Sequence, residues 1–142
     1  MLVALTAGGC GQDPVKVQSP ELTSSAREVC DRLVPALPDR VDGADRRETT
    51  QPALTAAWGD PPLVLRCGVT RPADLSPTSE ILEVEGVEWF LVESGAGYTF
   101  TTVGRTAHVE LTVPAEVDRS EATAPLVDLA AAVAGHDPPE EP

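Results

Sequence analysis

The chain has 142 residues, a length typical of one domain with one hydrophobic core. Its 23 acidic side chains outnumber the 10 basic ones, which gives a formal net charge of -13. Because this charge repels phosphate backbones and anionic lipid surfaces, we do not expect nucleic acid as a partner. The acidic residues are spread along the chain, as in a solubilising surface, and no stretch approaches the roughly 20 apolar residues of a membrane-spanning helix.

The first ten residues resemble the end of a bacterial lipoprotein signal. A short apolar run leads to Ala7, Gly8 and Gly9, and then to Cys10, the residue that lipoprotein processing would acylate. No basic residue precedes the cysteine and the apolar run is short, so the segment fits the stump of an anchor or a start codon placed too far downstream. The alternative is an untargeted N-terminus with an incidental free cysteine. We predict a truncated signal and a flexible tether over residues 1–18.

An amphipathic helix is predicted to follow the tether. Ser19 can cap an exposed amide, Pro20 is tolerated in the first turn, and Glu21 complements the positive end of the helix dipole. The helix is expected to stop by Pro35. Its apolar residues recur at three- and four-residue spacing and form one stripe, which places a cysteine on the buried face: Leu22, Ala26, Val29, Cys30 and Leu33.

A buried strand is predicted at 63–69, a compact apolar run between prolines that carries Cys67. Before it, residues 39–51 are polar and contain glycine, which indicates loop or edge structure. After it we predict two hairpins, with strands at 81–84 and 87–92, and at 98–103 and 106–113. In the last strand every second residue is apolar, so one face is buried and the other is wet: Ala107, Val109, Leu111 and Val113.

A second helix is predicted at 125–134, with Gly135 as its C-terminal cap. Residues 136–142 are acidic and rich in proline, which predicts a disordered tail, so the domain is expected to span 19–135. The order of helix, strands and helix predicts an α+β fold: a single antiparallel sheet of four to five strands with the N- and C-terminal helices packed on one face.

Cys30 and Cys67 are candidates for a disulfide, because one lies on the predicted helix and the other on a strand that this helix should cover. If the protein is exported, oxidation is expected, and the closed loop would stabilise the fold by roughly 4 kcal/mol. The alternative is a pair of reduced, buried core cysteines, as is common in cytosolic proteins.

No metal or cofactor is expected. Two cysteines without a CxxC spacing and two histidines in unrelated settings do not supply four zinc ligands. The glycines at 93–97 flank a serine, but they form neither the Gly-x-Ser-x-Gly elbow of hydrolases nor a phosphate-binding loop.

His108 and Glu110 are the one pair of side chains that could act as acid and base. They lie two residues apart on a predicted strand, so they project from the same face. The alternative is an ordinary solvated strand face, where polar residues at every second position are expected anyway.

Arginines in this acidic chain form a second candidate site. If several converged near a tryptophan, they could bind an anionic ligand, because the guanidinium group recognises carboxylate and phosphate in a bidentate manner. The alternatives are internal ion pairs for the arginines and core positions for the tryptophans. The candidate ligand-binding residues are Arg46, Arg47, Trp58, Arg66, Arg71, Trp89 and Arg105.

Several stretches together resemble the DUF3515 family of uncharacterised actinobacterial proteins over about residues 28–134. They are RRETTQPALTAAWGDPPLVLRCGVTRP, VEGVEWF and YTFTTVGRTAHVELTVPAE, with the block at 56–69 as the most specific part. The resemblance implies a small exported protein with a lipoprotein signal or a single membrane segment. It implies no activity and no catalytic residue.

We therefore expect a non-enzymatic, lipid-anchored domain at the extracytoplasmic face of the cell membrane. It would bind an envelope protein or an anionic ligand. The alternative is an enzyme that acts on an envelope substrate through an arginine-lined site with His108 and Glu110 as acid and base. A purely structural spacer is a third possibility.

Overall fold

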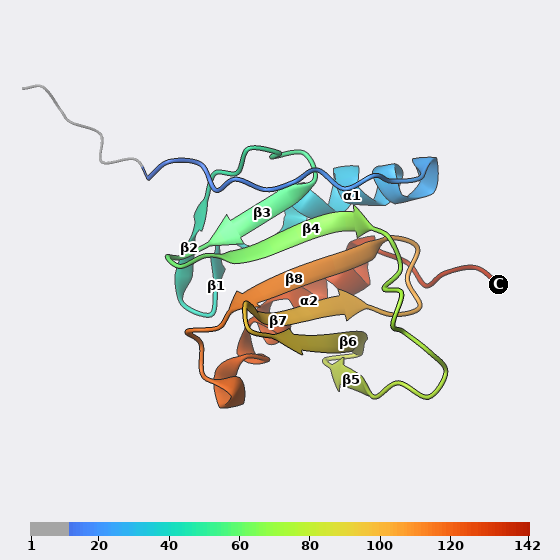
Figure 1. Ribbon diagram of the computed structural model, residues 1–142. Helices are drawn as coiled ribbons and strands as arrows, with labels where there is room; N and C mark the ends of the chain where they lie inside the picture. The colour runs from blue at the N-terminus through green and yellow to red at the C-terminus, as the bar shows by residue number, and fades with distance from the viewer. Residues whose placement is uncertain (1–11) are drawn as a thin grey trace, which may run out of the picture.

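The structure, a computed structural model, describes residues 12–142, so Cys10 lies outside the described residues. The fold is α+β: one eight-stranded antiparallel sheet with two helices, in the strand order β1-β2-β3-β4-β8-β7-β6-β5 (Figure 1). The strands are β1 (Arg40–Val41), β2 (Ala44–Arg47), β3 (Thr55–Trp58), β4 (Leu63–Val69), β5 (Ile81–Val84), β6 (Val87–Ser94), β7 (Gly97–Thr102) and β8 (His108–Pro114). The helices are α1 (Ser24–Ala36), the short 3-10 helix η1 (Arg119–Glu121) and α2 (Ala124–His136).

The sheet has eight strands where four to five were predicted. The additional strands β1 and β2 lie in the polar stretch at 39–51 and have only two and four residues, too few to show a periodic pattern. All four residues of β3 are buried, so this strand also lacks the alternation by which strands are recognised. The predicted strand at 63–69 and both predicted hairpins are present.

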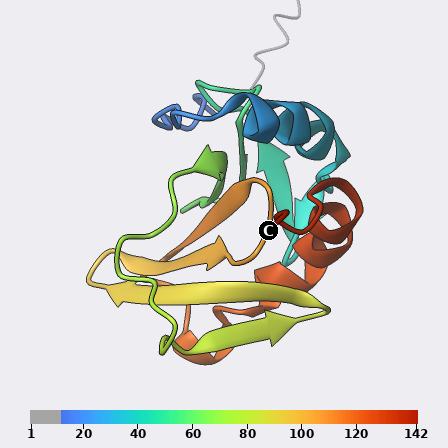
Figure 2. The same cartoon turned by 90° about the vertical axis from the view of Figure 1, so that its right-hand side faces the viewer.

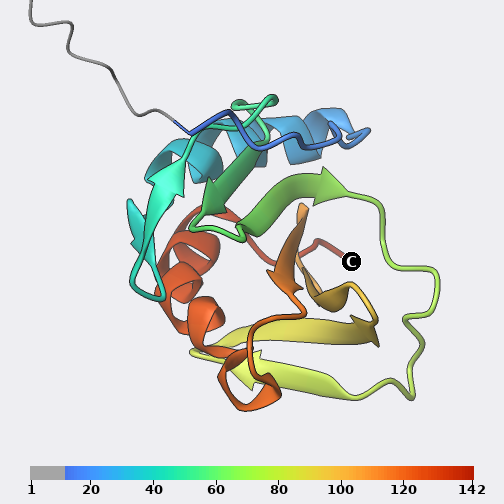
Figure 3. The same ribbon diagram turned by 60° about the vertical axis from the view of Figure 1, so that its left-hand side comes forward.

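The sheet is strongly twisted and bends around α2 (Figures 2 and 3). Helix α2 contacts β1 at one end of the strand order and both β5 and β6 at the other, while α1 contacts β4 and α2. We call the helix-facing side of the sheet the inner face and the opposite side the outer face. In β8 the inner residues are buried and alternate with partly exposed outer residues, as predicted.

Both helices have boundaries that differ from the prediction. Helix α1 starts at Ser24, not at Ser19, because the Thr23 hydroxyl accepts a hydrogen bond from the Ala26 amide at 3.2 Å and thereby caps the first turn. Pro35 lies inside the last turn of α1. Helix α2 continues through Gly135 to His136, so this glycine does not cap it.

The segments on either side of residues 19–135 form hydrogen bonds with the domain. Val15 forms a parallel bridge with Thr49, with its amide 2.8 Å from the Glu48 carbonyl oxygen. At the other end, the Thr106 amide donates to the Pro138 carbonyl and the Glu140 amide donates to the Gly104 carbonyl, both at 2.9 Å. Hydrogen bonds therefore connect the domain to residues on both sides of 19–135.

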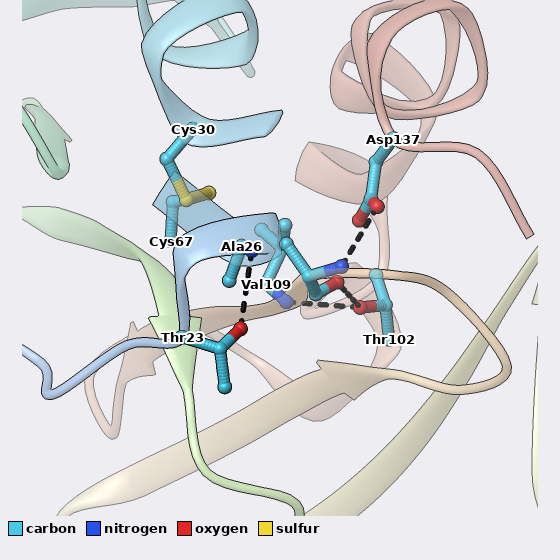
Figure 4. The surroundings of a disulfide bond; sticks show 8 residues. Thr23, Ala26, Cys30, Cys67, Thr102, Val109 and Asp137 are labelled. Atoms are coloured by element: carbon cyan, nitrogen blue, oxygen red, sulfur yellow. Dashed lines mark hydrogen bonds between the residues drawn. A yellow bond between two sulfur atoms is a disulfide. The ribbon is translucent and has the colours of Figure 1, made fainter. Parts of the chain in front are cut away.

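The predicted disulfide between Cys30 and Cys67 is present and joins α1 to β4 (Figure 4). Their Cα atoms are 5.8 Å apart, and both residues are completely buried in the core. Neither α1 nor α2 has the length and apolar character needed to cross a bilayer, and this holds for all of the described residues, 12–142.

Candidate functional site

The five candidate arginines do not converge on one site. Arg46 donates to the Val34 and Leu37 carbonyl oxygens, both at 3.2 Å, and so satisfies acceptors at the C-terminal end of α1. Arg47 donates to the Gly59 carbonyl at 3.0 Å and to the Asp13 carbonyl at 3.1 Å. Both guanidinium groups are used to connect segments of backbone.

The other three arginines also bind groups of the chain itself. Arg66 forms an ion pair with Glu110, Arg71 donates to the Leu75 carbonyl, and Arg105 donates to the carbonyl oxygens of Asp137 and Gly86. The acceptors for Arg71 and Arg105 are backbone carbonyls, and only Arg66 has the carboxylate partner expected of an internal ion pair.

Trp58 and Trp89 are completely buried on the inner face of the sheet. The Trp58 indole nitrogen donates to the Pro38 carbonyl at 3.0 Å. For Trp89 the indole nitrogen has no hydrogen-bond partner within the part of the chain that the structure describes. Neither ring presents a face to solvent on which a ligand could stack.

His108 and Glu110 lie on the outer face of β8, as the alternation predicts. Glu110, however, is held by Arg66, whose Nε atom is 2.9 Å and whose Nη2 atom is 3.3 Å from the two carboxylate oxygens. Because both of its oxygens accept hydrogen bonds from Arg66, this carboxylate is less available for contact with His108.

A groove of about 660 Å³ brings together two of the predicted site residues, Arg71 and His108. Its walls come from four segments: the start of α1, the end of β4, the start of β8 and the C-terminal segment. Further charged residues on the groove are acidic: Glu21, Glu140 and Glu141. The groove therefore presents both signs of charge, which suits a polar segment of a partner better than a simple anion.

Gly68 shapes the floor of this groove. It lies at a register irregularity between Cys67 and Val69 and has a φ of +92°, a conformation that favours glycine. A Cβ atom at this position would lie 2.8 Å from Leu22 Cδ2 and 3.5 Å from Cys30 Sγ. The disulfide and the groove floor are thus parts of one closely packed region.

Asp137 directly precedes Pro138, which lines the groove, and its side chain is completely buried. One carboxylate oxygen accepts a hydrogen bond from the Ala107 amide at 2.9 Å, and the other has no partner among residues 12–142. Burial raises the pKa of Asp137 from 3.8 to about 6, although this hydrogen bond and the charge of Arg105 act in the opposite direction. Asp137 was not among the predicted site residues, because it follows the helix in a short, proline-rich segment without periodicity.

No group of three or more potential metal-binding side chains occurs within residues 12–142. The family model described as "Protein of unknown function (DUF3515)" matches residues 1–142 of the chain. Comparisons with curated proteins and with solved structures gave no match.

Proposed function

Since the chain belongs to the DUF3515 family, whose function is unknown, we propose a role from its own chemistry: a lipid-anchored, non-enzymatic domain of the cell envelope that binds a protein partner. The observation that carries this proposal is the buried disulfide between Cys30 and Cys67. Such bonds persist in oxidising compartments and are rare in the cytosol. Together with Cys10 at the end of a lipoprotein-like segment, the disulfide supports a location outside the cytoplasmic membrane.

The groove of about 660 Å³ is the surface we propose for the partner. It combines apolar side chains such as Leu22 and Val69 with charged groups of both signs, the mixed composition found in protein interfaces. Recognition of a simple anion by several arginines is less well supported, since each of them donates to a group of this chain. The enzymatic alternative is also less well supported, because the Glu110 carboxylate forms an ion pair with Arg66.

The location can be tested with the full chain expressed in an actinobacterium. We expect the protein in the membrane fraction, with a lipid-modified Cys10 by mass spectrometry and a joined Cys30–Cys67 peptide in a nonreducing digest. The matched Cys10→Ala variant should leave the membrane fraction while keeping its disulfide. Unmodified Cys10 in cytosolic protein would contradict the anchor, and free thiols at Cys30 and Cys67 in exported protein would contradict the disulfide.

The groove can be tested by photocrosslinking in the same cells. A benzophenone side chain at Ser25 would lie on the groove, whereas one at Asp31 would lie on an exposed part of the same helix outside it. We expect a specific adduct from the Ser25 position alone. Equal adducts from both positions, or none from either, would argue against the groove.

A further inference from the structure

Strand β5 ends the sheet and has one edge without a neighbouring strand among the described residues. It is joined to β6 by Glu85 and Gly86, which both have positive φ (49° and 81°), as in a two-residue type I′ turn. In such a hairpin the residues that flank the turn, Val84 and Val87, exchange both backbone hydrogen bonds. Antiparallel alternation then directs the backbone amides and carbonyls of Ile81 and Glu83 away from β6.

An observed hydrogen bond supports this alternation. Glu88 lies opposite Glu83, and its carbonyl oxygen accepts a hydrogen bond from the Val103 amide at 2.9 Å, on the side away from β5. The pair is therefore not hydrogen-bonded across the hairpin. Within residues 12–142 the outward-directed backbone groups of Ile81 and Glu83 have no hydrogen-bond partner.

A pocket of about 340 Å³ opens beside this edge, between β5 and the segment that leads into α2. Leu82, Leu91, Tyr98 and Phe100 supply its apolar surface from the inner face of the sheet, and Arg119 and Glu93 on its rim form an ion pair at 2.9 Å. The pocket is large enough for one or two aliphatic side chains and lies where a strand added to β5 would project every second residue.

The charged residues of the β5–β6 hairpin from residue 80 to 88 are all of one sign, and Arg119 on the pocket rim is paired with Glu93. Glu80, Glu83, Glu85 and Glu88 are all acidic residues of this hairpin, and residues 80–88 contain no basic side chain. Glu83 and Glu88 lie opposite each other on the outer face, so an added strand would lie directly beside Glu83, with Glu88 one strand further in and within reach of a long side chain. Basic side chains on that strand would relieve the repulsion between these two carboxylates.

We propose that the β5 edge binds an extended, basic peptide segment of a partner protein, which joins the sheet as an additional strand. Its apolar residues enter the pocket, and the lysine or arginine residues between them face Glu83 and Glu88. A second copy of this chain is a poorer occupant, because it would bring another set of glutamates to the same edge. The β5 edge is distinct from the groove, so peptide binding at this edge depends neither on binding in the groove nor on the location of the protein.

The test uses the purified full chain with its disulfide intact and a capped nine-residue peptide of alternating lysine and valine. Isothermal titration calorimetry at low salt should show binding that weakens at least about tenfold in 0.5 M salt, because several charge pairs are screened. A peptide with N-methylated lysines keeps its charge and side chains, but it loses the backbone donors that face β5 in an antiparallel strand whose lysines lie beside Glu83, and we expect it to bind at least about tenfold more weakly. Failure of the first peptide to bind, or equal binding of the second, would overturn the proposal.

Variants of the protein test the same edge from the other side. Ile81→Pro removes an outward-directed amide without removing a bond to β6, whereas Ile81→Val keeps that amide. We expect weaker peptide binding for the first and unchanged binding for the second, with thermal unfolding confirming that both are folded. Glu83→Gln/Glu88→Gln should weaken binding more than Glu28→Gln/Asp31→Asn, which removes the same charge from α1. Equal effects of the two double variants, or a dimer that Ile81→Pro dissociates, would overturn the proposal.

Discussion

Arg66 and Glu110 lie directly opposite each other on β4 and β8, with Arg66 Nε 2.9 Å from Glu110 Oε1. Their side chains are 27% and 19% exposed, so solvent screens the pair less than it screens a pair on an open surface. The pair connects two central strands of the sheet on its outer face. Arg66 therefore gives Glu110 a structural role in joining these two strands.

A double-mutant cycle with Arg66→Gln and Glu110→Gln should give a coupling energy of about 1 kcal/mol in the free energy of unfolding. Each single variant leaves one half-buried charge without its partner. The losses of stability in the two single variants should therefore sum to more than the loss in the double variant. Urea denaturation at pH 7 measures all four proteins, and 0.5 M salt should reduce the coupling only in part. Additive single effects would show that the pair contributes nothing.

Loss of the disulfide should lower the free energy of unfolding by about 4 kcal/mol, because the unfolded chain regains the freedom of the closed loop. We expect this for Cys30→Ala/Cys67→Ala in guanidinium denaturation, with some further loss from the small cavity. The control is Cys10→Ala, which should unfold as the unaltered protein does. A loss below about 1 kcal/mol for the double variant would contradict the prediction.

Asp137 should make the protein less stable as the pH rises. Its pKa is about 6 in the folded state, against the ordinary value of 3.8 expected for the unfolded chain, so the folded state retains this proton longer. The stabilisation is fully present below pH 3.8 and is lost as the pH rises through about 6, by an amount on the order of 3 kcal/mol.

The matched variant is Asp137→Asn, whose amide oxygen can still accept the hydrogen bond from Ala107. Thermal unfolding between pH 4 and pH 7 should show a smaller decline for this variant than for the unaltered protein. The difference between the two curves removes the contribution of the other carboxylates. Parallel curves would show that Asp137 does not titrate in this range.

Gly68→Ala should destabilise the fold more than the same change at Gly86. Both glycines have positive φ, but only at Gly68 would the new Cβ atom meet a neighbour, Leu22 Cδ2, at 2.8 Å. We expect a loss of about 1 kcal/mol at Gly86 from backbone strain and about 2 to 3 kcal/mol at Gly68 from strain and close contact. Urea denaturation measures both, and equal losses would mean that Leu22 moves aside at little cost.

The central part of the fold could be predicted because its buried residues are apolar and recur at the spacing of a strand or of a helix. β8 alternates over its whole length, and the stripe of α1 contains Cys30 at the position that meets Cys67. The short strands could not be predicted in this way. β1 has two residues, and β3 is buried on both faces, so neither shows a period.

The arginines show a different limit. Arg46 binds two carbonyl oxygens of α1 and its C-terminal cap, and Arg105 binds the Asp137 carbonyl at 2.8 Å. Every residue has a backbone carbonyl, so a backbone hydrogen-bond acceptor cannot be recognised from the residue types in the sequence. The composition indicates that arginines need partners in an acidic chain, but which partner each one finds depends on where the fold brings the backbone.

The bridge between Val15 and Thr49 sets how far the domain could stand from a bilayer. If Cys10 carries the lipid, only about five peptide units separate it from Val15, and a fully extended chain of that length reaches at most about 18 Å. In that case the domain would lie close to the lipid headgroups and could not reach targets far from the bilayer. Its partners would be proteins that expose a segment within this narrow layer.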